Sequence, residues 1–318
     1  MHACLHTLDK GINFKRHTGN KAEQLCGVTM RRTVKQIVNS RATIEGAGVR
    51  LKRVFGYNEV PAFDPFLLLD HFGSENPDDY VRGFPWHPHR GIETVTYMLN
   101  GEVEHGDSIG NSGVIGSGDI QWMTAGSGII HQEMPRRYDG LMQGFQLWVN
   151  LPAEKKMIPP RYRGITKNQV PTLKKEGARL KVIAGKIDGT QGPIKDLVVN
   201  VEYFDVKLAA GKAFEHPTEK GCNVFVYAIE GSGYCEDTLI EPQHCALFGD
   251  GDSVKIETKS GLRFLFVSGK PLKEPVAWGG PIVMNNEKEL AKAFQELEEG
   301  TFIKTGRTVK PSRDFYRS

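Results

Sequence analysis

Short apolar segments of strand length recur along most of this chain, separated by Gly, Asp and Pro. β-branched and aromatic residues are common in these segments, which is typical of strands. Long helical periodicity is rare, so the pattern predicts an all-β fold of antiparallel strands arranged as a sandwich or barrel. The clearest segments read ETVTYML, GFQLWVNL, LKVIAG, NVFVYAIE, ALFGDGDSVKIE and RFLFVSG.

One short helix is expected near the C-terminus, at about residues 286–299. There Leu290, Phe294 and Leu297 recur at the spacing of one helical face. An Asn before this segment and a Gly after it are the residue types that usually begin and end a helix.

The strands form two similar series along the chain. VTYMLNG ends at Gly101 and resembles FVYAIEG, which ends at Gly231. GSGD ends at Asp119 and resembles GDGD, which ends at Asp252. The two pairs have nearly the same spacing, which predicts two copies of one β-domain. The join is expected near LPAEKKMIPPRYRG, because prolines interrupt the strand pattern there.

The expected organisation is a basic leader (residues 1–40), an N-terminal domain (41–160) and a C-terminal domain (161–318) that ends in the helix. Charge sets the leader apart, since residues 1–53 carry 11 Lys and Arg but only 3 Asp and Glu. We interpret this excess as a solvated tail and expect no direct binding to nucleic acid. Met30 is an alternative start to Met1, in which case the leader is not native.

Composition argues against several classes of protein. There is no continuous apolar run of about 18 residues, so no membrane span is expected. The N-terminus lacks the apolar core of a signal peptide, so the cytoplasm is the expected location, with the nucleus as the alternative for a eukaryotic chain. The 5 cysteines form no CxxC pair. Neither a disulfide framework nor a zinc knuckle is therefore expected.

The segment FPWHPHRGIETV contains His87 and His89. Alternate residues of a strand point to the same face, so the two imidazoles project together. The segment GIIHQEMP repeats this arrangement with His131 and Glu133. Two such strands can converge inside a small barrel, where three imidazoles and a carboxylate suit a divalent first-row metal. Iron with open positions for substrate and O2 is one interpretation, and zinc held by three histidines is its competitor.

Glu93 is a second candidate carboxylate, because it has the same strand parity as the histidines before it. Either Glu93 or Glu133 can be the fourth ligand, and the other would orient an imidazole or act as a general base. Carried across the repeat, His131 and Glu133 fall on Phe264 and Phe266. The second copy therefore lacks the cluster, which favours a function held by the N-terminal copy alone.

Residues next to the cluster are candidate contacts for a ligand. Arg90 can bind an anionic substrate or a protein partner, or it can pair with a nearby acid. Trp122 and Met123 can line an apolar cavity for a flat ligand, and core packing is the alternative for each of them. Pro88 lies between the two histidines and removes a backbone donor, so their strand is expected at a sheet edge.

These motifs together resemble the signatures of the pirin family, a branch of the cupin superfamily. The similar segments are FPWHPHRGIETVTYMLNGEVEHGDSIGN, GSGDIQWMTAGSGIIHQEMP, GFQLWVNLP and EPVAWGGPIVMNNEKEL. The likeness runs from about Val49 to about Phe302, so that the basic leader falls outside it.

The resemblance implies a bicupin, in which two jelly-roll β-barrels pack face to face and a mononuclear Fe²⁺ is bound only in the N-terminal barrel. It implies His87, His89, His131 and Glu133 as the metal ligands. The ordinary cupin pattern would instead take its carboxylate from Glu93. A monomer is expected, because the two barrels already cover each other's faces.

The resemblance also implies two functions of different class. The first is an iron-dependent dioxygenase that opens the heterocycle of a flavonol such as quercetin with O2, like quercetin 2,3-dioxygenases. Glu133 would take the flavonol proton, with Glu93 as the alternative base. The second is a metal- or redox-sensing transcriptional co-regulator without turnover, whose protein partner binds near Arg90. A metal-dependent isomerase or a sugar-binding cupin is a weaker alternative.

Overall fold

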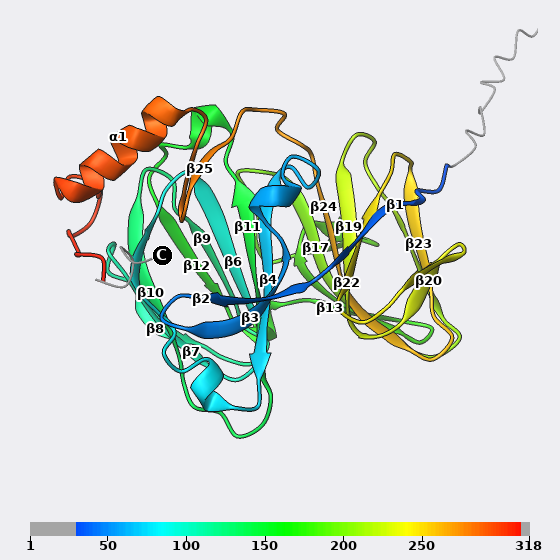
Figure 1. The fold of residues 1–318 in the computed structure, drawn as a ribbon. Coiled ribbons are helices and arrows are strands. Elements are labelled where there is room, and N and C mark those ends of the chain that lie inside the picture. The colour runs from blue at the N-terminus through cyan, green and yellow to red at the C-terminus, as the bar shows by residue number, and fades with distance from the viewer. Residues whose placement is uncertain (1–29, 313–318) are drawn as a thin grey trace, which may run out of the picture.

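A computed structural model describes residues 30–312 of the chain, so residues 1–29 of the expected leader lie outside the described part. Two barrels lie side by side, and each consists of one seven-stranded and one four-stranded sheet (Figure 1). The expected all-β fold with two cupin barrels is confirmed. Among the described residues, no helix is long and apolar enough to cross a membrane.

The N-terminal barrel is built from residues 41–165. Its larger sheet has the order β12 (Arg161–Ile165), β9 (Ile120–Thr124), β6 (Ile92–Asn100), β11 (Met142–Asn150), β4 (Phe66–Ser74), β3 (Val49–Phe55) and β2 (Arg41–Glu45). Its smaller sheet has the order β5 (Phe84–His89), β10 (Ile129–Pro135), β7 (Val103–Asp107) and β8 (Ser112–Ile115).

The C-terminal barrel repeats this arrangement. Its larger sheet has the order β1 (Val34–Asn39), β22 (His244–Phe248), β19 (Asn223–Gly231), β24 (Leu262–Gly269), β17 (Val201–Leu208), β14 (Ala178–Ala184) and β13 (Thr172–Lys175). Its smaller sheet has the order β18 (Ala213–Pro217), β23 (Ser253–Glu257), β20 (Gly233–Cys235) and β21 (Thr238–Ile240). Two short hairpins complete the strands, namely β15 (Lys186–Ile187) with β16 (Thr190–Gln191) and β25 (Ala277–Gly279) with β26 (Ile282–Met284).

The sheet orders confirm the internal repeat but correct one of its landmarks. β6 and β19 are both third in their sheets, as the likeness of their sequences predicts. Asp119, however, precedes β9 in a larger sheet, whereas Asp252 precedes β23 in a smaller one. The strand equivalent to β10 is therefore β23. The assignment of His131 and Glu133 to counterparts on β24 was wrong by one strand.

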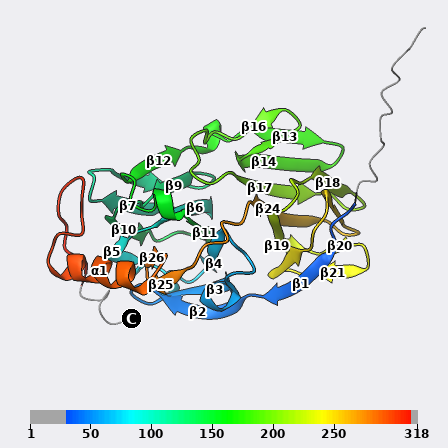
Figure 2. The same ribbon diagram turned by 90° about the horizontal axis from the view of Figure 1, so that it is seen from above.

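The two larger sheets face each other and bury the main core between the barrels (Figure 2). Aliphatic residues make up most of this core, and aromatic residues from both sheets help to fill the space between them. A polar contact crosses it, since the Tyr97 hydroxyl donates to Asp205 Oδ2 at 2.7 Å. Arg263 pairs with the same carboxylate at 2.9 Å. The barrels are therefore joined by apolar packing and by the Tyr97–Asp205 hydrogen bond, while the Arg263–Asp205 pair lies within the C-terminal barrel.

Segments near the domain boundaries cross between the barrels, which differs from the expected boundaries. β1 lies within the expected leader, yet it pairs with β22 of the C-terminal barrel. Arg32, just before β1, is buried and donates to Thr218 Oγ1 and to the carbonyl oxygens of Gly249 and Glu219. Residues 30–40 are thus an integral part of the second barrel, because their strand completes its larger sheet.

The helix α1 (Glu287–Glu298) lies where the sequence predicts it. The Asn286 side chain caps its start by accepting from the Glu289 backbone N–H at 2.9 Å. Its apolar face packs on the N-terminal barrel rather than on the second, against β26 and Ile130 (Figure 1). The C-terminal segment therefore returns to cover the first barrel.

Candidate metal centre

The three histidines of the sequence motifs meet inside the N-terminal barrel. β5 and β10 pair so that His131 lies directly opposite His87, and Ile129 opposite His89. One nitrogen of each of the three rings lies within 4.8 Å of the other two. β5 is the edge strand of its sheet, as Pro88 predicts. Proline has no backbone N–H, and an edge strand has one side on which no partner strand needs that donor.

Hydrogen bonds to backbone carbonyls define the tautomer of two of the rings. His87 Nδ1 lies 2.9 Å from the Pro85 carbonyl oxygen, and His89 Nδ1 lies 3.1 Å from the Pro281 carbonyl oxygen. A carbonyl only accepts, so each Nδ1 carries the proton and each Nε2 has a free lone pair. Those two Nε2 atoms nevertheless lie 3.1 Å apart.

The third ring also offers an unpaired nitrogen. Among the described residues, the buried His131 Nε2 has no hydrogen-bond partner. Burial lowers the pKa of His87 to about 4, and it lowers the pKa values of His89 and His131 well below the usual histidine value. Three neutral imidazoles therefore meet, two of them with lone pairs turned toward each other, and a divalent cation would satisfy this arrangement.

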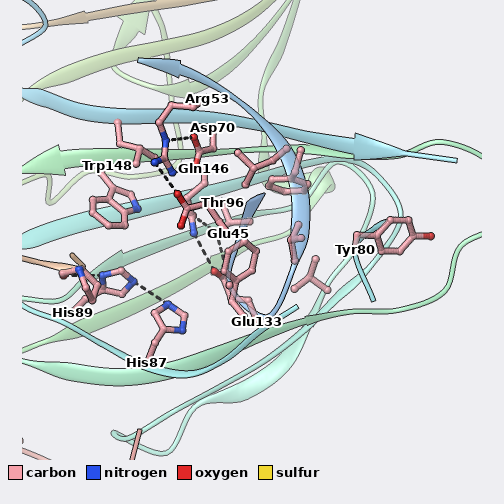
Figure 3. Close-up of a pocket in the computed structure, with 18 of the residues that line it drawn as sticks. Glu45, Arg53, Asp70, Tyr80, His87, His89, Thr96, Glu133, Gln146 and Trp148 are labelled. Atoms are coloured by element: carbon pink, nitrogen blue, oxygen red, sulfur yellow. Dashed lines mark hydrogen bonds and ion pairs between the residues drawn. The ribbon is translucent and has the colours of Figure 1, made fainter. Parts of the chain in front are cut away.

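Glu133 lies beside this cluster but outside the group of three nitrogens. Its Oε1 accepts from Thr96 Oγ1 at 2.8 Å, and its Oε2 accepts from Gln146 Nε2 at 3.0 Å (Figure 3). Burial raises the pKa of Glu133, while these two hydrogen bonds oppose the rise. The structure thus shows a positioned, buried carboxylate next to the imidazoles.

Glu93 does not join the cluster, contrary to the parity count. It is fully buried, and its Oε1 accepts from Thr124 Oγ1 at 2.5 Å. It shares a strand face with Val95 and Tyr97, which belong to the core between the barrels. The parity count from His89 to Glu93 failed because it crosses a turn between β5 and β6, where Gly91 has φ +79° and the alternation of faces is interrupted. Glu93 is therefore not placed as a ligand or as a base at this centre.

Three further candidates also lie away from any ligand surface. Arg90 is buried, pairs with Glu296 at 2.8 Å and stacks on Phe302 at 4.1 Å, so it pairs with an acid and offers no surface to a partner. Trp122 and Met123 are completely buried in two core clusters. Both therefore pack the core, which is one of the two roles expected for them, and neither lines a cavity.

A cavity of about 530 Å³ opens against the histidines within the N-terminal barrel. His87, His89 and Glu133 lie in its wall, while His131 is behind them. The Trp148 ring stands edge-on to His89, with ring centres 5.1 Å apart. The remaining wall is mostly apolar and aromatic, with members that include Tyr57, Leu51, Leu68, Phe72, Tyr80, Phe84, Met142 and Trp278.

Sequence reasoning missed several of these residues. Thr96 and Gln146 alternate with apolar residues on β6 and β11, and this alternation was a usable signal for the inner face of the barrel. The Pro281 carbonyl reaches His89 from a distant part of the chain. No local pattern predicts that contact, because it depends on the path of the C-terminal segment.

The second barrel holds no comparable group of three ligands among residues 30–312. On its inner face, His216 pairs with Val254 of β23 and bonds to Glu202 at 3.1 Å. Phe204, Phe214 and Phe266 surround the His216 ring. Aromatic side chains thus fill the space that is open in the first barrel.

Comparisons with known proteins agree with this geometry. The family model described as Pirin matches residues 48–149, and the Pirin C-terminal cupin domain matches residues 203–303. A pirin-like protein of Caulobacter vibrioides is 45% identical and covers 85% of this chain and 99% of its own length. Human pirin is 41% identical, over 82% of this chain and 90% of its own. The crystal structure of a quercetin 2,3-dioxygenase from Acinetobacter baumannii aligns with a TM-score of 0.80 and 33% identity, over 86% of this chain and 98% of its own.

Proposed function

The chain belongs to the pirin family of bicupins, and from that premise we propose that it is an iron-dependent dioxygenase acting on a flavonol such as quercetin. The observation that carries this proposal is the convergence of three imidazoles, of which His87 and His89 lie in the wall of a 530 Å³ cavity. A cavity of this volume is in the usual range for a drug-sized ligand. The quercetin 2,3-dioxygenase structure with the same fold supports the same reaction class.

The donor set fits a divalent iron. His87, His89 and His131 would hold it through their Nε2 atoms, and Glu133 is the proposed fourth ligand. Ferrous iron would supply Lewis acidity toward the hydroxyl and carbonyl oxygens of the flavonol, together with redox chemistry toward O2. The Nδ1–H bonds of His87 and His89 to carbonyl oxygens fix the direction of their rings.

Glu133 is proposed to accept the proton of the flavonol hydroxyl at a carboxylate oxygen. Burial raises the pKa of Glu133 and makes it a stronger base than an exposed glutamate. Thr96 and Gln146 hold its two oxygens and thereby set where the proton arrives. The overall reaction inserts both atoms of O2 into the heterocycle, which opens with release of carbon monoxide.

The aromatic wall gives the cavity its proposed selectivity for flat ligands. Trp148 and Trp278 lie next to each other, with ring centres 5.8 Å apart, and both line the cavity. Such surfaces bind planar rings with little loss of side-chain entropy. They also exclude water from the reacting atoms.

The experiment that tests this function is anaerobic loading with Fe²⁺, addition of quercetin, and admission of air. Loss of the flavonol absorbance with release of one carbon monoxide per quercetin is expected. His89→Ala should abolish both bound metal and turnover. Equal oxygen uptake by wild type and His89→Ala, or no turnover of several flavonols, would contradict the proposal.

A sensing protein without turnover is the other function considered. Its proposed partner surface was Arg90, which lies beneath Phe302 and is 2% exposed. No feature of the described residues favours that surface over the cavity. Absence of flavonol turnover in the assay above is the result that would favour this alternative.

A further inference from the structure

A row of polar residues crosses the inner face of the larger N-terminal sheet. Thr96 on β6 lies opposite Gln146 on β11, which lies opposite Asp70 on β4, which lies opposite Arg53 on β3. Directly paired residues point to the same face, so all four side chains line the cavity. In Figure 3, Arg53 and Asp70 lie at one end of the row and Gln146 stands between them and His87.

The far end of this row is an ion cluster of three residues. Arg53 donates to both oxygens of Asp70, at 2.9 and 2.8 Å. Its third nitrogen pairs with Glu45 Oε1 at 2.8 Å. Two carboxylates thus share one guanidinium, and the cluster carries an excess negative charge.

The cluster links three neighbouring strands, but its place in the cavity wall is not needed for that link. Asp70 lies on β4 between Leu68 and Phe72, which point into the same cavity. An apolar residue at position 70 would continue that pattern without the cost of burying a charge. Ligand sites typically combine an apolar wall with a few placed polar groups that fix orientation. The cluster has this character.

Unused hydrogen-bonding capacity in the cluster indicates the ligand chemistry. Glu45 Oε2 makes no hydrogen bond or ion pair within residues 30–312, and the Glu45 side chain is 37% exposed. A carboxylate oxygen accepts hydrogen bonds and repels anions. Of the charged residues in the cavity wall, three are carboxylates and one is a guanidinium. The ligand group at this end should therefore be a neutral donor.

We infer that Glu45, Arg53 and Asp70 form a distal subsite that binds the hydroxyl groups of a substrate ring remote from the histidines. The inference rests on the proposed function, because it assumes that the other end of a flavonol is held at the metal centre. A phenolic hydroxyl that donates to a carboxylate makes a charge-assisted hydrogen bond. A flavonol without hydroxyls on its pendant ring offers no such donor to Glu45 Oε2.

Equilibrium binding without turnover tests the subsite. Zn²⁺-loaded protein binds ligand at the same imidazoles but cannot reduce O2. Quenching of tryptophan fluorescence would report the dissociation constants of quercetin, which carries two hydroxyls on the pendant ring, and of 3,5,7-trihydroxyflavone, which carries none. Wild type should prefer quercetin by roughly tenfold or more, the value of one hydrogen bond to a charged group. A quercetin sulfonated on that ring should bind more weakly than quercetin.

Glu45→Gln should reduce the preference for quercetin by about tenfold and relieve the penalty on the sulfonated ligand. Glu104→Gln is the matched control, because Glu104 is exposed, pairs with Arg136 and lies outside the cavity wall. Asp70→Asn provides a second variant, which keeps the shape of the side chain and removes its charge. The control should retain the wild-type preference.

Equal affinity of wild type for both flavonols would overturn the subsite, and so would a preference that survives in Glu45→Gln and Asp70→Asn alike. Binding of both flavonols without discrimination would leave the proposed function intact and remove only the subsite. Failure of every flavonol to bind would overturn both.

Discussion

The Nε2 atoms of His87 and His89 lie 3.1 Å apart although neither carries a proton. Each ring has its proton on Nδ1, where it is donated to a backbone carbonyl. Two lone pairs at this separation repel each other unless a cation lies between them. The pair is held in place by the pairing of β5 with β10 and by the Pro281 carbonyl. A metal ion is the simplest partner for both nitrogens.

Metal binding should stabilise the fold, because an ion that binds only the folded state adds to its stability. At a free metal concentration 100 times the Kd, the gain is about 2.7 kcal/mol. For a protein of this size, that gain corresponds to roughly 4 °C in Tm. Thermal scans with Fe²⁺ or Zn²⁺ and with a chelator would measure it. His131→Ala should show no shift, and an equal shift in that variant would place the binding elsewhere.

The two buried glutamates should behave differently in turnover. Glu133→Gln should lower kcat by roughly 10² to 10⁴, since a neutral amide cannot accept the substrate proton. Glu93→Gln should leave kcat unchanged, because Glu93 faces Thr124 and the core between the barrels. Steady-state kinetics at matched metal content would separate these outcomes. A loss in Glu93→Gln as large as that in Glu133→Gln would contradict the geometry.

Arg90 should matter for stability rather than for binding. Arg90→Met leaves the Glu296 carboxylate without its guanidinium and removes the stacking on Phe302. Glu296 keeps Lys304 as a partner, but the buried carbonyl oxygens of Ser127 and Phe302 lose their donor, which costs about 1 to 3 kcal/mol. Urea unfolding would measure this, and proteolysis should become faster within residues 277–303. Arg136→Met, which breaks an exposed ion pair, is the control and should cost about 1 kcal/mol or less.

Lys156 gives the fold a defined pH dependence. Its Nζ is buried and donates to the Gly91 and Val283 carbonyls and to Asn150 Oδ1. Burial lowers the pKa of Lys156 to about 7 from 10.5. The unfolded chain then binds more protons than the folded one between these values, so this residue's contribution to stability rises with pH across that window.

Lys156→Met should therefore lose this rise. The unfolding free energy of wild type minus that of Lys156→Met should increase as the pH rises from 7 to 10. The neighbouring Lys155 is exposed, so Lys155→Met should track the wild type at every pH. A constant difference between wild type and Lys156→Met would show that the lysine keeps its ordinary pKa in the fold.

Local patterns in the sequence were sufficient for the fold and for the three imidazoles. His87 and His89 could be paired because strand alternation holds within one strand, and His131 joined them because its own strand repeats the pattern with Glu133. The same alternation failed for Glu93, because the turn at Gly91 resets which residues face inward. It also could not show that Arg90 is covered by Phe302, since that contact depends on how the C-terminal segment returns to the first barrel.

The sequence also did not show which barrel each strand joins. β1 completes the larger sheet of the C-terminal barrel, although it precedes every strand of the N-terminal barrel in the chain. Its pairing with β22 and the contacts of Arg32 with Thr218 and Gly249 place it in the second barrel. Such choices are made by tertiary contacts, which a local pattern does not record.

The metal stoichiometry of the protein under anaerobic conditions tests the central claim most directly. Equilibrium dialysis against Fe²⁺ should give about one bound ion per chain in wild type and in His244→Ala, a control in the second barrel. His131→Ala should bind none, because one of the three converging nitrogens is gone. No bound iron in wild type, or an undiminished ion in His131→Ala, would contradict a metal centre at His87, His89 and His131.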